Sequence, residues 1–268
     1  MLGGFRAVMQ RGDKRRLKEF YENEAERLSH QKMMYLKAEK HELWWHRKRL
    51  YYVISYLSEI FGEGQMKTFV DVGCAEGFYV KYVASSHSET FCIGADVARA
   101  YVKKAKTNVN ALNSDYVVCD VERLPFRNSG IDAVLCSEVL EHVHNYLGSL
   151  SELNRVVKKY LVLSFPGHSY LYQIMSRIRI AKNFADSLVP DVGHVSEVQV
   201  SKVREFLKGK YESLKIRIGG SLPIMVFKIV PSIRLVDIID DLICKVLEYF
   251  DAIDYATIHV MEIMKGES

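Results

Sequence analysis

The sequence predicts an α/β fold, a sandwich of helices packed on a mostly parallel sheet. Five short runs are rich in β-branched and aromatic residues, and they are residues 67–73, 90–96, 115–120, 131–137 and 159–165. The runs are hydrophobic throughout rather than alternating, which is typical of parallel strands covered on both faces. Segments with helical spacing of apolar residues separate most of the runs, and they are residues 79–85, 98–111 and 146–157.

The residues before the first run predict a helical cap. From Asp13 to Phe61 there is neither proline nor glycine, and charged residues alternate with Leu, Tyr, Met and Trp at helical spacing. The letters GEGQ at 62–65 then break the helical pattern. We therefore expect an N-terminal helical cap over residues 1–61 and a principal domain over residues 62–268.

The C-terminal third of the chain predicts one insertion and two more strands. Residues 169–190, after the fifth run, have a helical pattern and are expected to form a lid over the ligand edge of the sheet. Further strands are expected within 211–220 and 255–265, with an amphipathic helix at roughly 232–250 between them.

Composition limits the classes of function. The 37 basic and 33 acidic residues leave a formal net charge of only +4, without the excess typical of a dedicated nucleic-acid binder. The five cysteines form no CxxC pair, which favours reduced thiols. No window reaches the roughly 18 uninterrupted apolar residues of a spanning helix. We therefore expect a cytoplasmic protein.

Ligands of open parallel sheets bind beyond the carboxyl ends of the strands, so the residues at those ends are the candidate site. These residues are Asp71, Gly73 and Gly77, then Asp96, then Asp120, and finally Ser137 and Glu138. Glycines allow the backbone to approach a ligand closely, and the amides that open the next helix can donate hydrogen bonds. Three successive strands are thus predicted to end in an aspartate.

The spacing of these residues points to a nucleoside cofactor without phosphate. Asp96 lies 25 residues after Asp71, near the spacing at which a second-strand carboxylate accepts hydrogen bonds from ribose hydroxyls. The turn reads GCAEG and lacks the second glycine of GxGxxG, which admits a pyrophosphate. No P-loop pattern occurs. S-adenosylmethionine has ribose and adenine without phosphate, and Asp71 and the turn are candidates for its amino-acid end.

The ordered motifs VDVGCAEG, GADVARAYVKKA, CDVERLPFRNSGIDAVLCSEVLEHV and GHVSE resemble those of class I S-adenosylmethionine-dependent methyltransferases, especially the type 11 group. The resemblance implies a Rossmann-like sheet of seven strands whose last strand is antiparallel. It also implies Asp96 at the ribose and Asp120 with Val121 at the adenine. The predicted cofactor-binding residues are Asp71, Gly73, Cys74, Ala75, Gly77, Asp96, Val97, Asp120, Val121 and Ser137. Ala75 departs from the pattern, since many relatives carry glycine there.

Glu138, Glu141 and His142 follow the fourth strand at spacings that would share one face of a helix. Such a set can hold a divalent metal, with His168 or His194 as a further ligand. The favoured interpretation is that the stretch lines the cofactor pocket and that no metal is bound. His194 is also a candidate base, but the sequence assigns no catalytic residue.

The favoured hypothesis is a methyltransferase that acts on a small-molecule or lipid-like acceptor at oxygen or nitrogen. One alternative is an RNA methyltransferase, and another is a catalytically silent cofactor-binding scaffold. Five aromatic residues of the cap are candidates for an acceptor cavity, although packing is the commoner role: Tyr21, Trp44, Trp45, Tyr51 and Tyr52.

The helix expected near 232–250 is a candidate for contact with a membrane or with a second subunit, so a homodimer is open. Four acids of this helix oppose its binding to an anionic lipid surface, and they are Asp237, Asp240, Asp241 and Glu248.

Overall fold

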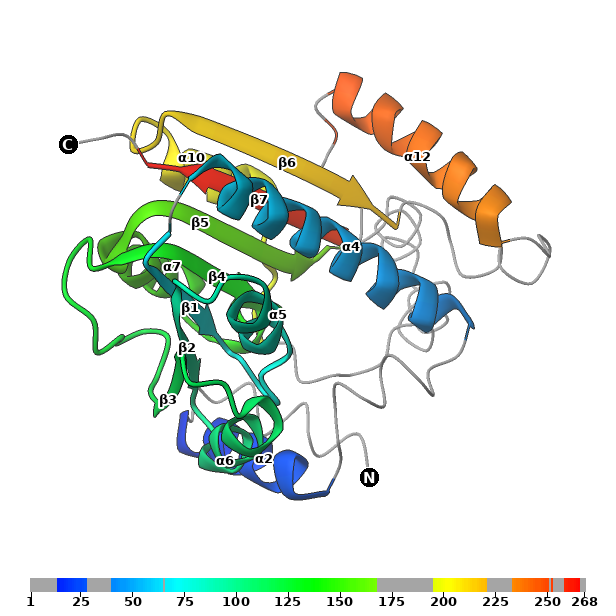
Figure 1. Ribbon diagram of the computed structural model, residues 1–268. Helices are drawn as coiled ribbons and strands as arrows, with labels where there is room; N and C mark the ends of the chain where they lie inside the picture. The colour runs from blue at the N-terminus through cyan, green and yellow to red at the C-terminus, as the bar shows by residue number, and fades with distance from the viewer. Residues whose placement is uncertain are drawn as a thin grey trace.

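The computed structural model describes most of the chain (Figure 1). The described residues are 14–27, 40–64, 66–167, 195–220, 233–250, 252 and 258–265. The predicted insertion at 169–190 lies outside them, and so do His168 and His194. None of the described helices has the length and apolar composition that crossing a membrane requires.

A single seven-stranded sheet forms the centre of the protein, in the order β3-β2-β1-β4-β5-β7-β6. Its strands are β1 (Thr68–Val72), β2 (Phe91–Asp96), β3 (Ser114–Val118), β4 (Ile131–Ser137), β5 (Val157–Pro166), β6 (Ser213–Gly219) and β7 (Ile258–Met264). The first five pair in parallel, whereas β7 is antiparallel to both neighbours. The predicted mixed sheet with its antiparallel last strand is confirmed.

Alternate residues of the central strands build two separate cores. On β4, Val134 and Cys136 pack into one hydrophobic cluster, while Ala133 and Leu135 pack into the other. This alternation is the period of two that a pleated strand imposes. Both faces are therefore buried, which explains why the strand sequences are apolar throughout.

Helices cover both faces of the sheet, close to the predicted bounds. They are α5 (Phe78–Ser86), α6 (Arg99–Val109), α7 (Tyr146–Val156), α10 (Val200–Leu207) and α12 (Ile233–Tyr249), with a 3₁₀ turn η1 at Leu140–His142. Residues of α5 and α6 enter one core, and residues of α7 and α10 enter the other. Figure 1 shows α12 at the periphery, beyond β6.

The predicted N-terminal cap contains two described helices that pack on different parts of the protein. The first is α2 (Lys14–Arg27) and the second is α4 (Lys40–Glu63). α4 lies along the sheet and buries Val53, Tyr56 and Leu57 in the same core as α5 (Figure 1). α2 instead packs on α6, at the edge where the candidate site lies. Helix-capping hydrogen bonds also join α2 to α6.

Glu22 of α2 caps the N-terminus of α6. Its two carboxylate oxygens accept hydrogen bonds from the backbone N–H groups of Arg99 at 2.8 Å and Ala100 at 2.9 Å. The residue at the cap position, Ala98, has no side-chain oxygen, so an acid from elsewhere satisfies the first amides of the helix. A negative charge is also favourable at this end of a helix.

Candidate functional site

The turn after β1 takes a conformation that requires glycine. Gly73 and Gly77 have φ of 82° and 83°, in the left-handed region that favours glycine. A Cβ at Gly73 would lie 2.2 Å from Cγ2 of Val139, and one at Gly77 would lie 2.9 Å from Cγ2 of Val109. Both glycines are therefore explained by backbone conformation and by packing on neighbouring residues of the chain.

The backbone amides of this turn are largely used within the protein. Gly73 and Cys74 both donate to the carbonyl oxygen of Ala95, at 2.7 and 3.0 Å. Ala75 donates to Oδ2 of Asp96 at 2.9 Å. The turn is thus fixed onto β2 by its own backbone amides.

Asp96, the last residue of β2, holds the two loops together. Its other oxygen, Oδ1, accepts a hydrogen bond from the N–H of Ala98 at 2.9 Å. Burial raises the pKa of Asp96 to about 6, against the lowering effect of these hydrogen bonds. Because each carboxylate oxygen can accept more than one hydrogen bond, Asp96 keeps acceptor capacity for a bound hydroxyl.

Asp71 lies beside Asp96, but one of its carboxylate oxygens lacks a hydrogen-bond donor among the described residues. It pairs with Gly94 of β2 and Leu135 of β4 in the centre of the sheet, and its side chain is fully buried. No described residue donates a hydrogen bond to its Oδ2. Burial, with a smaller contribution from the charge of Asp96, raises its pKa to about 8. A buried acceptor left in this state is costly unless a ligand pairs with it.

A third buried acid, Glu141, lies in the same region. Both carboxylate oxygens of Glu141 lack a hydrogen-bond partner among the described residues. Burial, and then the neighbouring Glu138, raise the pKa of Glu141. His142 lies next to it, with Nε2 at 3.7 Å from Oε1 of Glu141. The ring of Tyr21, from α2, meets the His142 ring edge-on with centroids 5.6 Å apart.

Tyr21 brings the N-terminal cap to the site. Its hydroxyl is buried and has no hydrogen-bond partner in the described part of the chain. Burial, followed by the charge of Glu141, raises its pKa. Tyr21 and Ala75 both pack against a small cluster that contains Ala98, and Ala75 and Ala98 are the residues that donate to Asp96. The sequence named Tyr21 only as one aromatic among several, because the pairing of α2 with α6 is not visible in the sequence.

The predicted shared helix face of Glu138, Glu141 and His142 is wrong. Glu138 has a φ of 57°, and only residues 140–142 form a helical turn, so the chain bends between the two acids. Glu138 instead pairs with Arg49 of α4 at 3.0 Å and accepts a hydrogen bond from Ser164 at 3.0 Å. Within the described residues, no group of three His, Cys, Asp or Glu side chains is placed to hold a metal ion.

The remaining predicted residues differ in their surroundings. Asp120 lies two residues beyond β3, and its Oδ1 accepts a hydrogen bond from the N–H of Glu122 at 2.9 Å. Val121 is buried in the core, while Val97 is half-buried in the bend after β2. Ser137 shares a hydrogen bond of 2.7 Å with Ser164, which links the ends of β4 and β5.

Most of the aromatic residues proposed for an acceptor cavity pack elsewhere. Trp44 is buried and donates from Nε1 to Asp237 of α12 at 2.5 Å. The hydroxyl of Tyr52 donates to the carbonyl oxygen of Ile218 on β6 at 3.2 Å. Tyr51 is exposed. Trp45 stacks under the guanidinium of Arg49 at 5.1 Å, beside Glu138.

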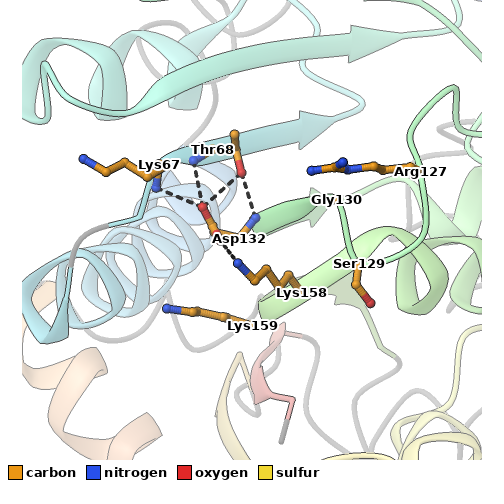
Figure 2. A pocket seen from close by; sticks show the side chains of 8 residues that line it. All are labelled: Lys67, Thr68, Arg127, Ser129, Gly130, Asp132, Lys158 and Lys159. Atoms are coloured by element: carbon orange, nitrogen blue, oxygen red, sulfur yellow. Dashed lines mark hydrogen bonds and ion pairs between the residues drawn. The ribbon is translucent and has the colours of Figure 1, made fainter. Parts of the chain in front are cut away.

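A basic pocket lies at the opposite edge of the sheet (Figure 2). Its volume is about 390 Å³, and its lining residues are Lys67, Thr68, Arg127, Ser129, Gly130, Asp132, Lys158 and Lys159. These residues surround the starts of β1, β4 and β5, whereas Asp71 and Asp96 lie toward the carboxyl ends of their strands. The pocket is therefore separate from the candidate site.

Comparison with known proteins agrees with this geometry. Residues 70–163 match the family described as a methyltransferase domain, in its type 11 group. A ubiquinone biosynthesis O-methyltransferase of Nitrosomonas europaea is 31% identical over 130 residues, which cover 46% of this chain and 54% of that protein. The match covers 37% and 43% of the length of two other curated relatives. The chain therefore spans about half the length or less of these relatives.

Solved structures share the fold. Magnesium protoporphyrin IX methyltransferase of Synechocystis PCC 6803, solved with bound SAH, superposes with a TM-score of 0.63 at 15% identity, covering 95% of this chain and all of that one. A phosphoethanolamine N-methyltransferase of Haemonchus contortus gives a TM-score of 0.53 at 15% identity, over 80% of this chain and 52% of the other. Residues 70–163 therefore match a methyltransferase domain family, and the seven-stranded sheet has the fold of these solved methyltransferases.

Proposed function

We propose that the protein is an S-adenosylmethionine-dependent methyltransferase that acts on a small-molecule or lipid-like acceptor. The observation that carries the proposal is the buried pair of Asp71 and Asp96 at the glycine turn. Asp71 has an oxygen without a described donor, and its pKa is raised to about 8. A cationic amino group would satisfy that oxygen and favour the ionised form of the carboxyl group.

The residues present fit this cofactor in their donor and acceptor chemistry. Asp71 offers an acceptor for the amino group, and Asp96 offers acceptors for the two ribose hydroxyls. Val97, Asp120 and Val121 follow β2 and β3 and are assigned to the adenine end, with apolar contact from the buried valine. The turn between Gly73 and Gly77 carries no long side chain next to these carboxylates except Glu76, which is turned into the protein.

The bound cofactor supplies an electrophilic methyl group, and the chain's own residues align the acceptor and exclude water. Tyr21 of α2 packs against Ala98 and lies near the charges of Glu141 and Asp96, which supports a covering role for the cap at 1–61 above the domain at 62–268. Glu141 holds its proton to a higher pH than an ordinary glutamate, so it can donate a hydrogen bond to an acceptor oxygen. An acceptor hydroxyl must also lose a proton, and we assign His142, whose Nε2 lies 3.7 Å from Oε1 of Glu141, as the candidate group to take it.

The chemistry of the relatives supports acceptors of this class. The Nitrosomonas europaea relative is named for ubiquinone biosynthesis and for transfer to oxygen. A relative from Desulfotalea psychrophila, 28% identical over 97 residues, is named for transfer to carbon in ubiquinone and menaquinone biosynthesis. These names favour an apolar small molecule as the acceptor, with transfer to oxygen or nitrogen as our assignment for this chain.

Two measurements test the proposal. Calorimetry should detect binding of S-adenosylmethionine and S-adenosylhomocysteine to the folded protein, and failure to bind either would overturn it. Incubation with methyl-labelled cofactor and fractionated cell extract should then label the small-molecule or lipid fraction. Binding without transfer to any fraction would support the silent-scaffold alternative. For variants of Asp71 or Asp96, Asp132→Asn is the matched control, because Asp132 lies at the opposite edge of the same sheet, at the start of β4.

An RNA acceptor is the second candidate, and the basic pocket favours it. Lys67, Arg127 and Lys159 join Lys158 around that pocket, and clustered cations of this kind attract phosphates. A relative from Bos taurus, 26% identical over 122 residues, is named a probable tRNA methyltransferase, but this chain spans only 24% of its length. Salt-dependent binding of RNA, together with labelled methyl in the RNA fraction, would rank this candidate first.

A further inference from the structure

Two side chains near the carboxyl ends of the strands carry buried polar atoms that are unpaired within the described part of the chain. These atoms are both carboxylate oxygens of Glu141 and the hydroxyl of Tyr21. Tyr21 comes from α2, and Glu141 comes from the η1 turn after β4. Buried polar groups in proteins are nearly always hydrogen-bonded, so unpaired ones mark a place where the partner comes from outside the chain.

His142 shows that these two side chains are close together. Its ring meets the ring of Tyr21 edge-on, with centroids 5.6 Å apart. Its Nε2 lies 3.7 Å from Oε1 of Glu141. After burial, the charge of Glu141 is the largest cause of the raised pKa of Tyr21. The two side chains are therefore neighbours, yet no hydrogen bond joins the Tyr21 hydroxyl to the Glu141 carboxyl.

Tyr101 of α6 is a second tyrosine in the same small cluster, and its hydroxyl has a different role. Tyr101 is buried in the cluster against which Tyr21 packs. Its hydroxyl donates to Oε2 of Glu24 in α2 at 3.2 Å. This bond and the cap made by Glu22 fix α2 on α6. The position of α2 is thus explained without the hydroxyl of Tyr21, which leaves that hydroxyl available for a ligand.

We propose that the hydroxyl of Tyr21 donates a hydrogen bond to the oxygen of an acceptor hydroxyl, in a subsite that Tyr21 forms with Glu141. A hydroxyl oxygen has two lone pairs, so it can accept a hydrogen bond and still attack the methyl group. An amine has a single lone pair for both purposes, and a protonated amine has none. The inference rests on the proposed function and deepens it, because it selects oxygen over nitrogen as the methylated atom.

The proposed bond also assists the loss of the acceptor proton. A donor that faces an oxygen stabilises the charged form of that oxygen and so lowers the pKa of the acceptor hydroxyl. Proton transfer to His142, the candidate base, becomes easier as a result. Tyr21 would thereby make the N-terminal helix α2 a part of the acceptor site as well as its cover.

Urea unfolding of the full chain without ligand tests whether the Tyr21 hydroxyl is needed by the fold. Tyr21→Phe keeps the ring but removes an unpaired buried hydroxyl, so its unfolding midpoint should equal or exceed that of wild type. Tyr101→Phe is the matched control. It removes the bond to Glu24 and should lower the midpoint by roughly 0.3–0.5 M. A midpoint lowered as far in Tyr21→Phe would assign its hydroxyl to the fold and overturn the proposal.

Transfer of labelled methyl into the extract fraction that wild type labels tests the contact itself. Tyr21→Phe should lower the rate at limiting extract roughly tenfold, whereas Tyr101→Phe should stay within about twofold of wild type. Calorimetric affinity for S-adenosylhomocysteine should stay within about twofold in both variants. The labelled product should carry its methyl group on oxygen, and a product methylated on nitrogen would contradict the proposal.

The outcomes separate this proposal from the proposed function. Equal transfer by wild type and Tyr21→Phe would overturn the contact while the methyltransferase assignment stands. Weaker binding of S-adenosylhomocysteine in Tyr21→Phe would place the hydroxyl on the cofactor, which also contradicts a contact with the acceptor. Absence of cofactor binding or of any transfer in wild type would overturn the proposed function, and this inference with it.

Discussion

Asp71 and Asp132 lie on neighbouring strands of one sheet and have opposite environments. Asp132, at the start of β4, accepts hydrogen bonds at Oδ2 from the N–H of Lys67 at 2.9 Å and from the N–H and hydroxyl of Thr68, both at 3.1 Å. Figure 2 shows Lys158 reaching the same carboxylate, at 3.5 Å. Asp71, in β1, has an oxygen with no described donor.

The pKa values of the two aspartates follow from this difference. Burial alone would raise the pKa of Asp132, but the donors of Lys67 and Thr68 and the charge of Lys158 bring it below its usual value. For Asp71, nothing offsets burial, and its pKa rises to about 8. An aspartate whose partners come from the chain stabilises the fold. An aspartate whose partner must come from outside the chain marks a ligand site.

Replacement of Asp71 should have the largest effect on cofactor binding. Asp71→Asn removes the charge that would pair with a cationic amino group, while it keeps the shape of the side chain. We expect binding of S-adenosylmethionine to weaken roughly 10- to 100-fold, the cost of one charged hydrogen bond. Calorimetry on wild type, Asp71→Asn and Asp132→Asn checks it. Equal affinity in Asp71→Asn would remove the assignment of this carboxylate to the ligand.

Asp96→Ala should both weaken cofactor binding and destabilise the glycine turn. The N–H groups of Ala75 and Ala98 would lose their acceptor, and an unsatisfied buried donor costs about 1–3 kcal/mol. We therefore expect both a lower midpoint of urea unfolding and a higher dissociation constant. The conservative variant Asp96→Asn keeps an acceptor oxygen and should recover part of the stability. If Asp96→Ala changed stability alone, Asp96 would be a structural aspartate like Asp132.

Asp132→Ala should give the reverse pattern. Three hydrogen bonds from Lys67 and Thr68 would lose their acceptor, so we expect a loss of about 2–3 kcal/mol in the free energy of unfolding. Cofactor affinity should be unchanged when it is measured well below the unfolding midpoint. Urea titration paired with calorimetry distinguishes the two effects. Loss of cofactor affinity in folded Asp132→Ala would contradict the assignment of Asp132 to the fold and of Asp71 to the ligand.

The sequence predicted the edge of the sheet that carries Asp71 and Asp96, but not the opposite edge that carries Asp132. The strands, the order of their terminal residues and the place of Asp71 and Asp96 follow from apolar runs and spacing. The sequence did not single out Asp132, because its partners Lys67 and Thr68 lie at the start of another strand and become its neighbours only when β1 and β4 pair. For the same reason the sequence missed Arg49 beside Glu138, and it expected a helix where Glu138 takes a left-handed conformation.

Stability should depend on pH through Asp71 in the cofactor-free protein. Its folded pKa of about 8 exceeds the ordinary value of 3.8, so the folded state binds the extra proton between these values. The stabilisation from that proton is complete below the lower value and is lost as the pH rises toward 8. We expect Asp71→Asn to gain stability relative to wild type between pH 6 and pH 8.5, by roughly 2–3 kcal/mol. A constant difference across that range would contradict the raised pKa.

The smallest effect is expected at Ala75, where the motif that the turn resembles implies a glycine. Its φ of 44° is left-handed, a conformation that costs a non-glycine residue about 1 kcal/mol. Ala75→Gly would relieve this strain, but glycine loses more chain entropy on folding, which offsets up to about 1 kcal/mol. We therefore expect unfolding free energy within about 0.5 kcal/mol of wild type. Cofactor affinity should also stay within about twofold, because the N–H of residue 75 still donates to Asp96. A larger loss of affinity would mean that the methyl group of Ala75, which packs against the same small cluster as Tyr21, contributes to the cofactor site.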